Sequence, residues 1–139
     1  MATRLGDMAV GSTVKIKVNG TLTDFLIVQQ GKPSSIYDDS CNGTWLLMND
    51  VYTTSVFGYT SSFGNNYNNY EKSPIHSHLN NTFFSLIDGD IRNAIKQVKI
   101  PYKKGLGFQG SLATGANGLS TKVFLLSGYE VGWTTSDNG

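Results

Sequence analysis

The sequence predicts an α+β domain with a mainly antiparallel sheet and two helices that are grouped together in the chain. Three observations support this prediction. An alternating hairpin near the N-terminus is followed by other short apolar stretches, and two amphipathic stretches follow each other instead of alternating with strands. Only 15% of the 139 residues are charged, and the polar character comes from Asn, Ser, Thr, Gly and Tyr, which suits loop-rich β structure.

The first two strands are expected to form a hairpin. Val14–Val18 alternates between apolar and polar residues, which is the period of a half-buried strand. An Asn-Gly pair follows and favours a tight type I′ turn, so Thr21–Val28 is the expected return strand. In this register Lys15 faces Asp24 across the two strands. The return strand ends in four consecutive apolar residues, which indicates a central place in its sheet.

A third strand and a long loop are expected next. Thr44–Met48 is a short, mostly apolar stretch that predicts a strand. From Tyr52 to Tyr70 the chain consists almost wholly of Tyr, Thr, Ser, Asn, Gly and Phe. This composition, without helical or strand periodicity, predicts a long surface loop.

Two helices are expected after this loop. Ser73 is suited to cap the first helix, and Pro74 is suited to its first position. Apolar residues recur at helical spacing over residues 75–87 and again over residues 91–98. An Asp-Gly-Asp sequence at 88–90 separates the two stretches, and either aspartate can cap the second helix.

The last part of the chain is expected to contain a loop and a strand. Val98–Ile100 predicts a short extended piece, and the glycine-rich stretch Gly105–Gly118 predicts a flexible loop. The apolar stretch Lys122–Ser127 predicts the last strand. Little sequence follows to cover this strand, so we expect residues 1–139 to form a single domain that lacks its C-terminal segment.

Charge and hydropathy disfavour two classes of partner. The net charge is +1, and the loose cluster of Lys96, Lys99, Lys103 and Lys104 is expected to be solvated, so no nucleic-acid partner is predicted. No apolar stretch is long enough to span a bilayer, and no signal peptide is recognisable. We therefore expect a protein made in the cytoplasm, without a membrane partner.

No catalytic residue, metal site or cofactor is predicted. His76 and His78 are two positions apart, so they point away from each other on a helix and cannot share a metal. The aspartates at 88 and 90 begin like a calcium loop, but Arg92 and Lys99 occupy ligand positions of that motif.

Single reactive side chains do not form a catalytic arrangement in the sequence either. Cys41 lies in an acidic turn, which opposes a reactive thiolate. Ser127 lacks the glycine two residues earlier that a nucleophile elbow requires, and Glu130 has no evident acidic partner.

The loop rich in Tyr and Asn is the best candidate for a binding surface. Tyr offers a large contact area at a small entropic cost, and Asn offers adaptable hydrogen bonds. The predicted ligand-binding residues are Tyr52, Tyr59, Asn65, Asn66, Tyr67, Asn68, Asn69 and Tyr70. The alternative is a loop that packs on its own domain or is buried in an oligomer.

The whole chain also resembles an uncharacterised domain family of gut bacteria and their tailed phages. The resemblance rests on the order and spacing of several motifs, none of which is specific alone. These motifs are residues 11–14, Phe25–Val28, Pro33–Tyr37, Trp45–Leu47, Tyr70–Ser73, Leu79–Phe83, Ile95–Pro101 and Val123–Gly132.

The resemblance implies a C-type-lectin-like fold of the kind shared with formylglycine-generating enzymes and phage tropism proteins. Members of this family continue with a Trp-Trp-Leu-Arg-Ser-Pro motif and close with Gly-Val-Arg-Pro-Ala, and this sequence contains neither. The resemblance therefore implies an incomplete fold here. It supplies no catalytic residues to transfer.

Three functions remain open from the sequence. The first is a non-enzymatic binding or structural module, phage- or prophage-encoded, that acts in a virion or in adhesion and recognises a glycan or a host-surface protein. The second is the N-terminal part of an enzyme whose active site a missing C-terminal segment completes. The third is a chain that associates with another copy through exposed sheet edges.

Overall fold

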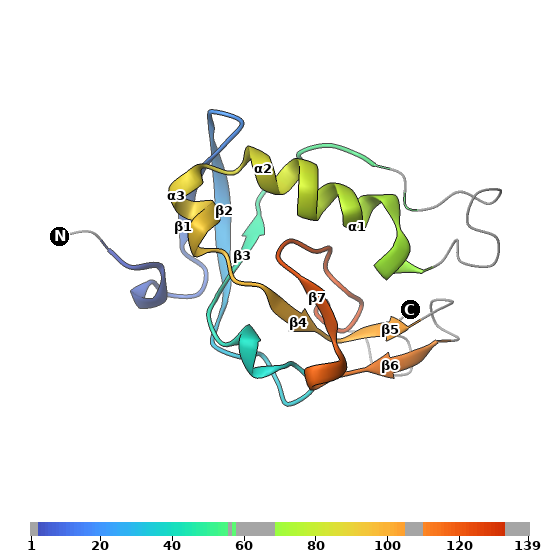
Figure 1. The fold of residues 1–139 in the computed structure, drawn as a ribbon. Coiled ribbons are helices and arrows are strands. Elements are labelled where there is room, and N and C mark those ends of the chain that lie inside the picture. The colour runs from blue at the N-terminus through green and yellow to red at the C-terminus, as the bar shows by residue number, and fades with distance from the viewer. Residues whose placement is uncertain (1–2, 56, 58–68, 105–109, 133–139) are drawn as a thin grey trace.

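The computed structural model describes residues 3–55, 57, 69–104 and 110–132 of the chain (Figure 1). Its strands form one three-stranded and two two-stranded sheets, and every pair within these sheets is antiparallel. The predicted α+β class with a mainly antiparallel sheet is therefore confirmed, although the strands are divided among three sheets. None of the described helices is long and apolar enough to cross a membrane.

The strands occupy both ends of the chain. They are β1 (Thr13–Val18), β2 (Thr21–Gln30), β3 (Thr44–Met48), β4 (Val98–Ile100), β5 (Tyr102–Lys104), β6 (Ser111–Ala113) and β7 (Leu119–Thr121). The order in the large sheet is β1-β2-β3, while β4 pairs with β7 and β5 pairs with β6.

The helical elements lie mostly in the middle of the chain. The α-helices are α1 (Pro74–His78), α2 (Phe84–Leu86) and α3 (Gly89–Ala94), and a π-helical segment, η5 (Leu79–Phe83), joins α1 to α2. Short 3-10 turns are η1 (Leu5–Asp7), η2 (Asp39–Cys41), η4 (Tyr70–Lys72) and η7 (Gly115–Asn117).

The predicted hairpin is confirmed in its register. Lys15 pairs with Asp24, and the Lys15 Nζ lies 2.6 Å from the Asp24 Oδ1. Asn19 and Gly20 have φ values of 50° and 77°, the left-handed conformations that a type I′ turn requires. β2 lies between β1 and β3, as its apolar end predicts.

The first predicted helix is confirmed, and it runs from Pro74 to Leu86 through the π-helical segment. The Ser73 Oγ accepts a hydrogen bond from the His76 amide at 3.2 Å, so Ser73 is the predicted cap. After Leu86 the chain becomes extended, and Ile87 forms an isolated antiparallel bridge with Val18. This bridge connects the end of the helix that spans Pro74 to Leu86, here called the main helix, to the end of β1.

The second helix is shorter than predicted. Asp88 caps α3 by accepting a hydrogen bond from the Gly89 amide at 3.0 Å. The helix ends at Ala94, and Ile95 is already extended. Val98, the last member of the predicted helical stripe, lies in β4 because its backbone pairs with Thr121 of β7.

Two predictions for the end of the chain are wrong. The described part of the predicted flexible loop contains β6 and η7, because β6 pairs with β5. The predicted strand at residues 122–127 has no strand structure, and β7 ends at Thr121. The backbone after Thr121 bonds to the side-chain amide of Asn80 instead of to another strand, as described below.

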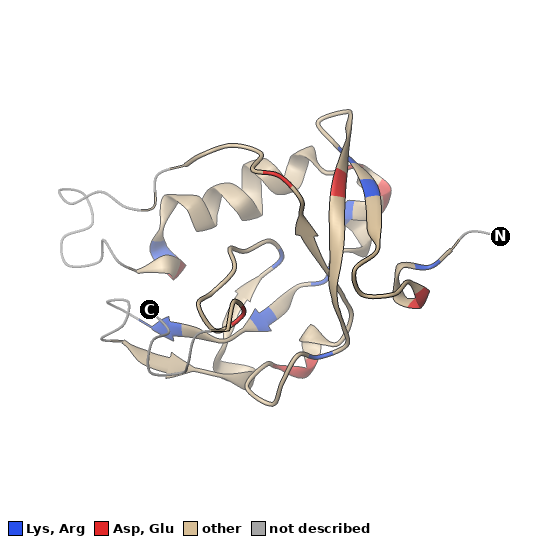
Figure 2. Cartoon of the chain, turned by 180° about the vertical axis from the view of Figure 1, so that it is seen from behind, with Lys and Arg blue, Asp and Glu red and all other residues tan. Residues whose placement is uncertain are grey.

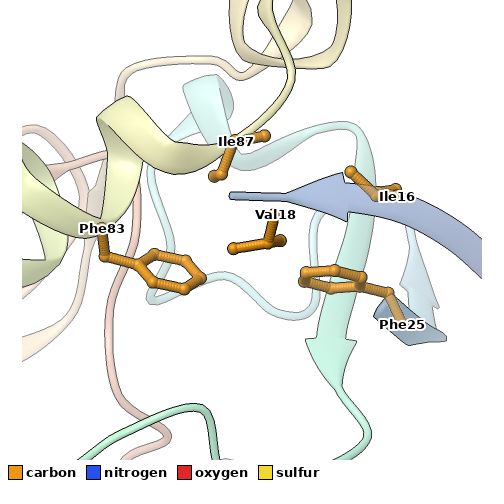
Figure 3. Close-up of a cluster of buried hydrophobic side chains, with 5 residues drawn as sticks. All are labelled: Ile16, Val18, Phe25, Phe83 and Ile87. Atoms are coloured by element: carbon orange, nitrogen blue, oxygen red, sulfur yellow. The ribbon is translucent and has the colours of Figure 1, made fainter. Parts of the chain in front are cut away.

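Buried apolar side chains form two separate clusters. The helix cluster, shown in Figure 3, consists of Ile16, Val18, Phe25, Phe83 and Ile87, which point toward one another between the hairpin and the main helix. The ring cluster consists of Tyr37, Cys41 and Ile100, with Trp45, Phe124 and Tyr129 packed against them. Residues of both clusters line a cleft that lies between them.

Candidate functional site

A partly open cleft with a volume of about 400 Å³ lies between the two clusters. Phe25, Phe83 and Ile87 of the helix cluster line one part of it. Cys41, Trp45 and Phe124 of the ring cluster line another part. Interiors of folded proteins rarely contain voids much larger than a water molecule, whereas ligand sites have volumes of this size. The cleft is therefore the candidate functional site.

Four parts of the chain supply most of the walls of the cleft. The first wall comes from β3 of the large sheet, and the second comes from Phe83 of the main helix. The third wall comes from α3 and β4 together, and the fourth comes from the segment after β7. The apolar residues of the last two walls are Ile91, Ala94, Ile95, Val98, Val123, Phe124 and Leu126. In Figure 1 the segment after β7 curls between the main helix and the two small sheets. The site thus depends on segments distant in the sequence.

The cleft runs along the free edge of β3. Successive side chains of a strand point to opposite faces of the sheet. Leu46 and Leu47 are neighbours in β3, yet both line the cleft. Since β3 is an outer strand of the three-stranded sheet, a cleft that reaches both of its faces lies along the edge that has no partner strand in the described part of the chain.

The lining of the cleft offers little catalytic chemistry. Among the described residues that line it, none carries a carboxylate or an imidazole, and the charged ones are Lys96 and Lys122. The Lys96 Nζ donates to the Asn42 carbonyl at 2.7 Å. The Lys122 Nζ lies 4.6 Å from the centre of the Phe84 ring. Both ammonium groups thus have local partners in the fold.

Cys41 is buried at the ring-cluster side of the cleft. Its thiol donates to the Lys99 carbonyl at 3.3 Å. Burial raises the pKa of the Cys41 thiol above its ordinary value, so the side chain stays protonated at neutral pH. The structure therefore gives Cys41 a packing role at the cleft.

Asn80 holds the fourth wall of the cleft in place. Its Oδ1 accepts hydrogen bonds from the amides of Lys122 and Val123 at 2.8 and 3.2 Å, and from the Thr121 Oγ1 at 3.1 Å. Its Nδ2 donates to the Val123 carbonyl at 2.8 Å and to the His76 carbonyl at 3.0 Å. One side chain thus satisfies the backbone groups that a neighbouring strand would otherwise satisfy.

A second set of hydrogen bonds closes the turn that follows this wall. The Tyr37 hydroxyl donates to the Glu130 Oε1 at 2.9 Å. The Glu130 Oε2 accepts from the Ser127 amide at 2.7 Å and from the Ser127 Oγ at 3.1 Å. Burial and the nearby Glu130 charge raise the pKa of Tyr37, so it remains a donor. The sequence places Ser127 and Glu130 three positions apart, but nothing in it indicates Tyr37 as their partner.

The structure describes three of the predicted ligand-binding residues. Tyr52 is 43% exposed, and its ring packs edge-on against Phe83 with a centroid distance of 5.3 Å. Asn69 is only 2% exposed, and its Oδ1 has no hydrogen-bond partner among the residues that the structure describes. Tyr59, Asn65, Asn66, Tyr67 and Asn68 lie outside the described residues.

Tyr70 is the third of these residues, and it connects the loop to the fourth wall of the cleft. Its hydroxyl accepts a hydrogen bond from the Leu125 amide at 3.0 Å. Its ring lies 6.3 Å from that of Phe57 in a stacked arrangement, and 5.0 Å from that of His76 edge-on. Tyr70 therefore fastens the end of the loop to the segment after β7.

The two histidines stand apart from the cleft lining. Burial lowers the pKa of His76, and its ring contacts Tyr70. The His78 Nε2 is buried, and no described residue is its hydrogen-bond partner. Within the described part of the chain, no group of three or more His, Cys, Asp or Glu residues could hold a metal ion. Neither histidine is among the described residues that line the cleft.

Charges elsewhere are dispersed. Figure 2 shows basic and acidic positions spread over the described chain. Of the four lysines that cluster in the sequence, Lys96 and Lys99 bind main-chain carbonyls, the latter at 2.9 Å from Ala116. Shape and apolar lining are thus the main properties of the candidate site.

Comparison with known proteins places the chain in a family. No curated protein and no solved structure matches it. The sequence model of DUF6273, a domain of unknown function, matches residues 42–139. This range holds most of the residues that line the cleft, among them those from β3, the main helix and the segment after β7. The chain therefore belongs to the DUF6273 family.

Proposed function

We propose that the chain is a non-enzymatic binding module that holds an apolar segment of a partner protein in the cleft. The observation that supports this function is the cleft itself, with its volume of about 400 Å³ and its lining of apolar side chains from both clusters. Burial of one Leu- or Val-sized side chain contributes roughly 1.5–3 kcal/mol. A few such side chains in the cleft would therefore support specific binding.

The proposal is tested by fluorescence with an apolar probe. Trp45 lines the cleft, and the only other tryptophan in the sequence is Trp133, so the variant Trp133→Phe leaves Trp45 as the sole reporter. Anilinonaphthalene sulfonate is a suitable probe, because it is apolar and carries an anion that the lysines of the lining tolerate. We expect saturable quenching of Trp45 emission as the probe binds.

A matched pair of variants makes this test specific for the cleft. Ala94 lines the cleft, whereas its neighbour Asn93 does not line it, and both side chains are exposed. In the Trp133→Phe background, Ala94→Phe should weaken probe binding at least about tenfold by partly filling the cleft, and Asn93→Phe should leave it unchanged. Equal effects of the two variants, or no saturable quenching, would overturn the proposal.

The biological setting is a separate proposal. We infer that the chain acts in a phage or prophage virion or in adhesion, with a glycan or a host-surface protein as its partner, on an incomplete C-type-lectin-like fold. The sequence resemblance supports this setting, as do exposed aromatic rings such as Phe57, which is 44% exposed. Loss of host-surface binding after Tyr59→Ala, Tyr67→Ala and Tyr70→Ala together would support it, and unchanged binding would refute the role of the loop.

A competing proposal is an enzyme whose active site a further segment completes. The observation that favours it is the group of Ser127, Glu130 and Tyr37 beside a small pocket lined partly by Tyr37, Ser127 and Tyr129. A longer protein that turns over a small molecule, and loses this activity with Glu130→Gln while remaining folded, would support it. Retention of activity in that variant would exclude this group as the catalytic centre.

A further inference from the structure

The free edge of β3 carries main-chain groups that need hydrogen-bond partners. The Asn49 amide bonds to the Asp24 carbonyl at 3.0 Å, and the Gly31 amide bonds to the Gly43 carbonyl at 2.9 Å. These two bonds flank β3 and direct the N–H and C=O groups of its odd-numbered residues toward β2, because the direction alternates along an antiparallel strand. The same groups of the even-numbered residues therefore point to the open edge.

Leu46 and Met48 are even-numbered residues of β3, so their main-chain groups point to the open edge. Within the described part of the chain, no hydrogen bond reaches their main-chain N–H and C=O groups on the open edge. Such a row of unpaired donors and acceptors is a template for another extended chain. The partner that satisfies these groups must itself offer main-chain groups at the spacing of a β-strand.

The cleft supplies apolar contacts on both sides of this edge. Phe83 of the main helix belongs to the helix cluster on one side, while Val98 of β4 and Phe124 of the segment after β7 pack against the ring cluster on the other. A strand added to β3 would alternate its side chains between the two faces of the sheet. An added chain with apolar residues at alternate positions would bury those side chains in the cleft.

The charges of the lining restrict the composition of the added chain. Lys96 and Lys122 are the charged residues among the described cleft lining, and both are cationic. An acidic residue at either end of the added chain would complement them, whereas a cationic residue would be repelled. The ligand chemistry is therefore an extended, mainly apolar peptide with an acidic flank.

We propose that β3 binds an extended peptide segment of a partner protein as an additional strand, with alternate side chains of that segment in the cleft. This inference rests on the proposed function, which requires only that an apolar ligand enters the cleft. It goes further by assigning main-chain hydrogen bonds to Leu46 and Met48.

The first test measures amide hydrogen exchange on the full chain. The probe is a short acetylated and amidated peptide of alternating Val and Thr with Glu at both ends. On addition of this peptide, exchange of the Leu46 and Met48 amides should slow by about tenfold or more, because these amides gain acceptors. The Leu47 amide points toward β2 and serves as the internal control, with little expected change.

The second test changes the peptide and leaves the protein intact. Two N-methylated forms of the peptide are compared. One form carries N-methyl groups on its odd-numbered residues and the other on its even-numbered residues, so that each form loses the amide donors of one edge. Because only one edge can face β3, the two forms should differ in affinity by about tenfold or more. Equal affinities of the two forms would overturn the proposal.

The remaining outcomes separate this proposal from the proposed function. Binding of anilinonaphthalene sulfonate in the cleft, with no exchange protection by the peptide, would overturn the added strand and leave the binding cleft intact. Failure of both probes would overturn both proposals. In the peptide-free protein, exchange of the Leu46 and Met48 amides could become slower as the protein concentration is raised. This result would identify a second copy as the occupant and would overturn the proposal of a partner peptide.

Discussion

The helix cluster and the ring cluster are both buried, but different kinds of interaction hold them. The helix cluster joins regular elements, since Ile16 and Val18 come from β1 and Phe83 from the main helix. In the ring cluster, Phe124 and Tyr129 belong to segments without strand or helix structure. Single side chains, above all Asn80 and Glu130, hold these segments through hydrogen bonds.

This difference indicates how the cleft is supported. Its wall at the helix cluster depends on apolar burial that is spread over many residues. The opposite wall depends on a few specific hydrogen bonds, and removal of one partner leaves buried donors without acceptors. Substitutions should therefore affect global stability on one side and local order of the cleft wall on the other.

The largest effect is expected from Phe83→Ala in the helix cluster. Phe83 is 5% exposed, and its removal should lower the free energy of unfolding by about 3–5 kcal/mol through lost burial and a new cavity. Urea denaturation measures the change. Leu22→Ala is the control, since Leu22 is 58% exposed, and an equal loss in this variant would contradict the assignment of the core.

The next effect is expected from Asn80→Ala, which removes the partner of three main-chain groups around Val123. The expected loss is about 2–3 kcal/mol, because the amides of Lys122 and Val123 lose their acceptor. Asn81→Ala is the matched control, since its side-chain amide is exposed and, among the described residues, bonds to Ser77 alone. If amide exchange of Val123 were equally fast in both variants, Asn80 would not be the support of this wall.

A smaller effect is expected from Tyr37→Phe, which removes the hydroxyl that bonds to Glu130. The free energy of unfolding should fall by about 1–2 kcal/mol. Burial raises the pKa of Tyr37 above its ordinary value of 10.0, so its stabilising contribution is complete below that pH and is lost as the pH rises further. Alkaline denaturation should therefore be less steep in the variant, and identical profiles would contradict this role of Tyr37.

The smallest effect is expected from His76, which lies beside Tyr70 at the end of the loop. Burial lowers the pKa of His76 below its ordinary value of 6.5, so the unfolded chain binds the proton more readily. Stability should be complete above that value and should decrease as the pH falls through the lowered pKa. In His76→Gln this decrease should disappear from acid denaturation curves, and its persistence would show that another group causes it.

The sequence predicts the helix cluster better than the ring cluster, for a physical reason. The alternation from Val14 to Val18 and the helical spacing of Leu79 and Phe83 report which face is buried, because each pattern matches one regular element. The register of the hairpin follows from its turn. The π-helical segment at Leu79–Phe83 is not predicted, although it lies where Asn80 contacts the segment after β7.

The cleft could not be predicted from the sequence. The apolar run at residues 123–126 has the composition of a strand, but its course is set by the Asn80 side chain, which lies more than forty positions earlier. Trp45 and Phe124 meet at a centroid distance of 5.5 Å, and no local pattern indicates this contact. Non-local contacts of single side chains therefore decide where the site lies.

The cleft between the two clusters is expected to admit an apolar ligand. Nuclear Overhauser effects between bound anilinonaphthalene sulfonate and the methyl groups of the protein show where the ligand lies. Contacts to Leu46, Ile95 and Val123 are expected, and these residues belong to three different walls of the cleft. Contacts instead to exposed methyl groups outside the cleft, such as those of Leu22, would contradict this expectation.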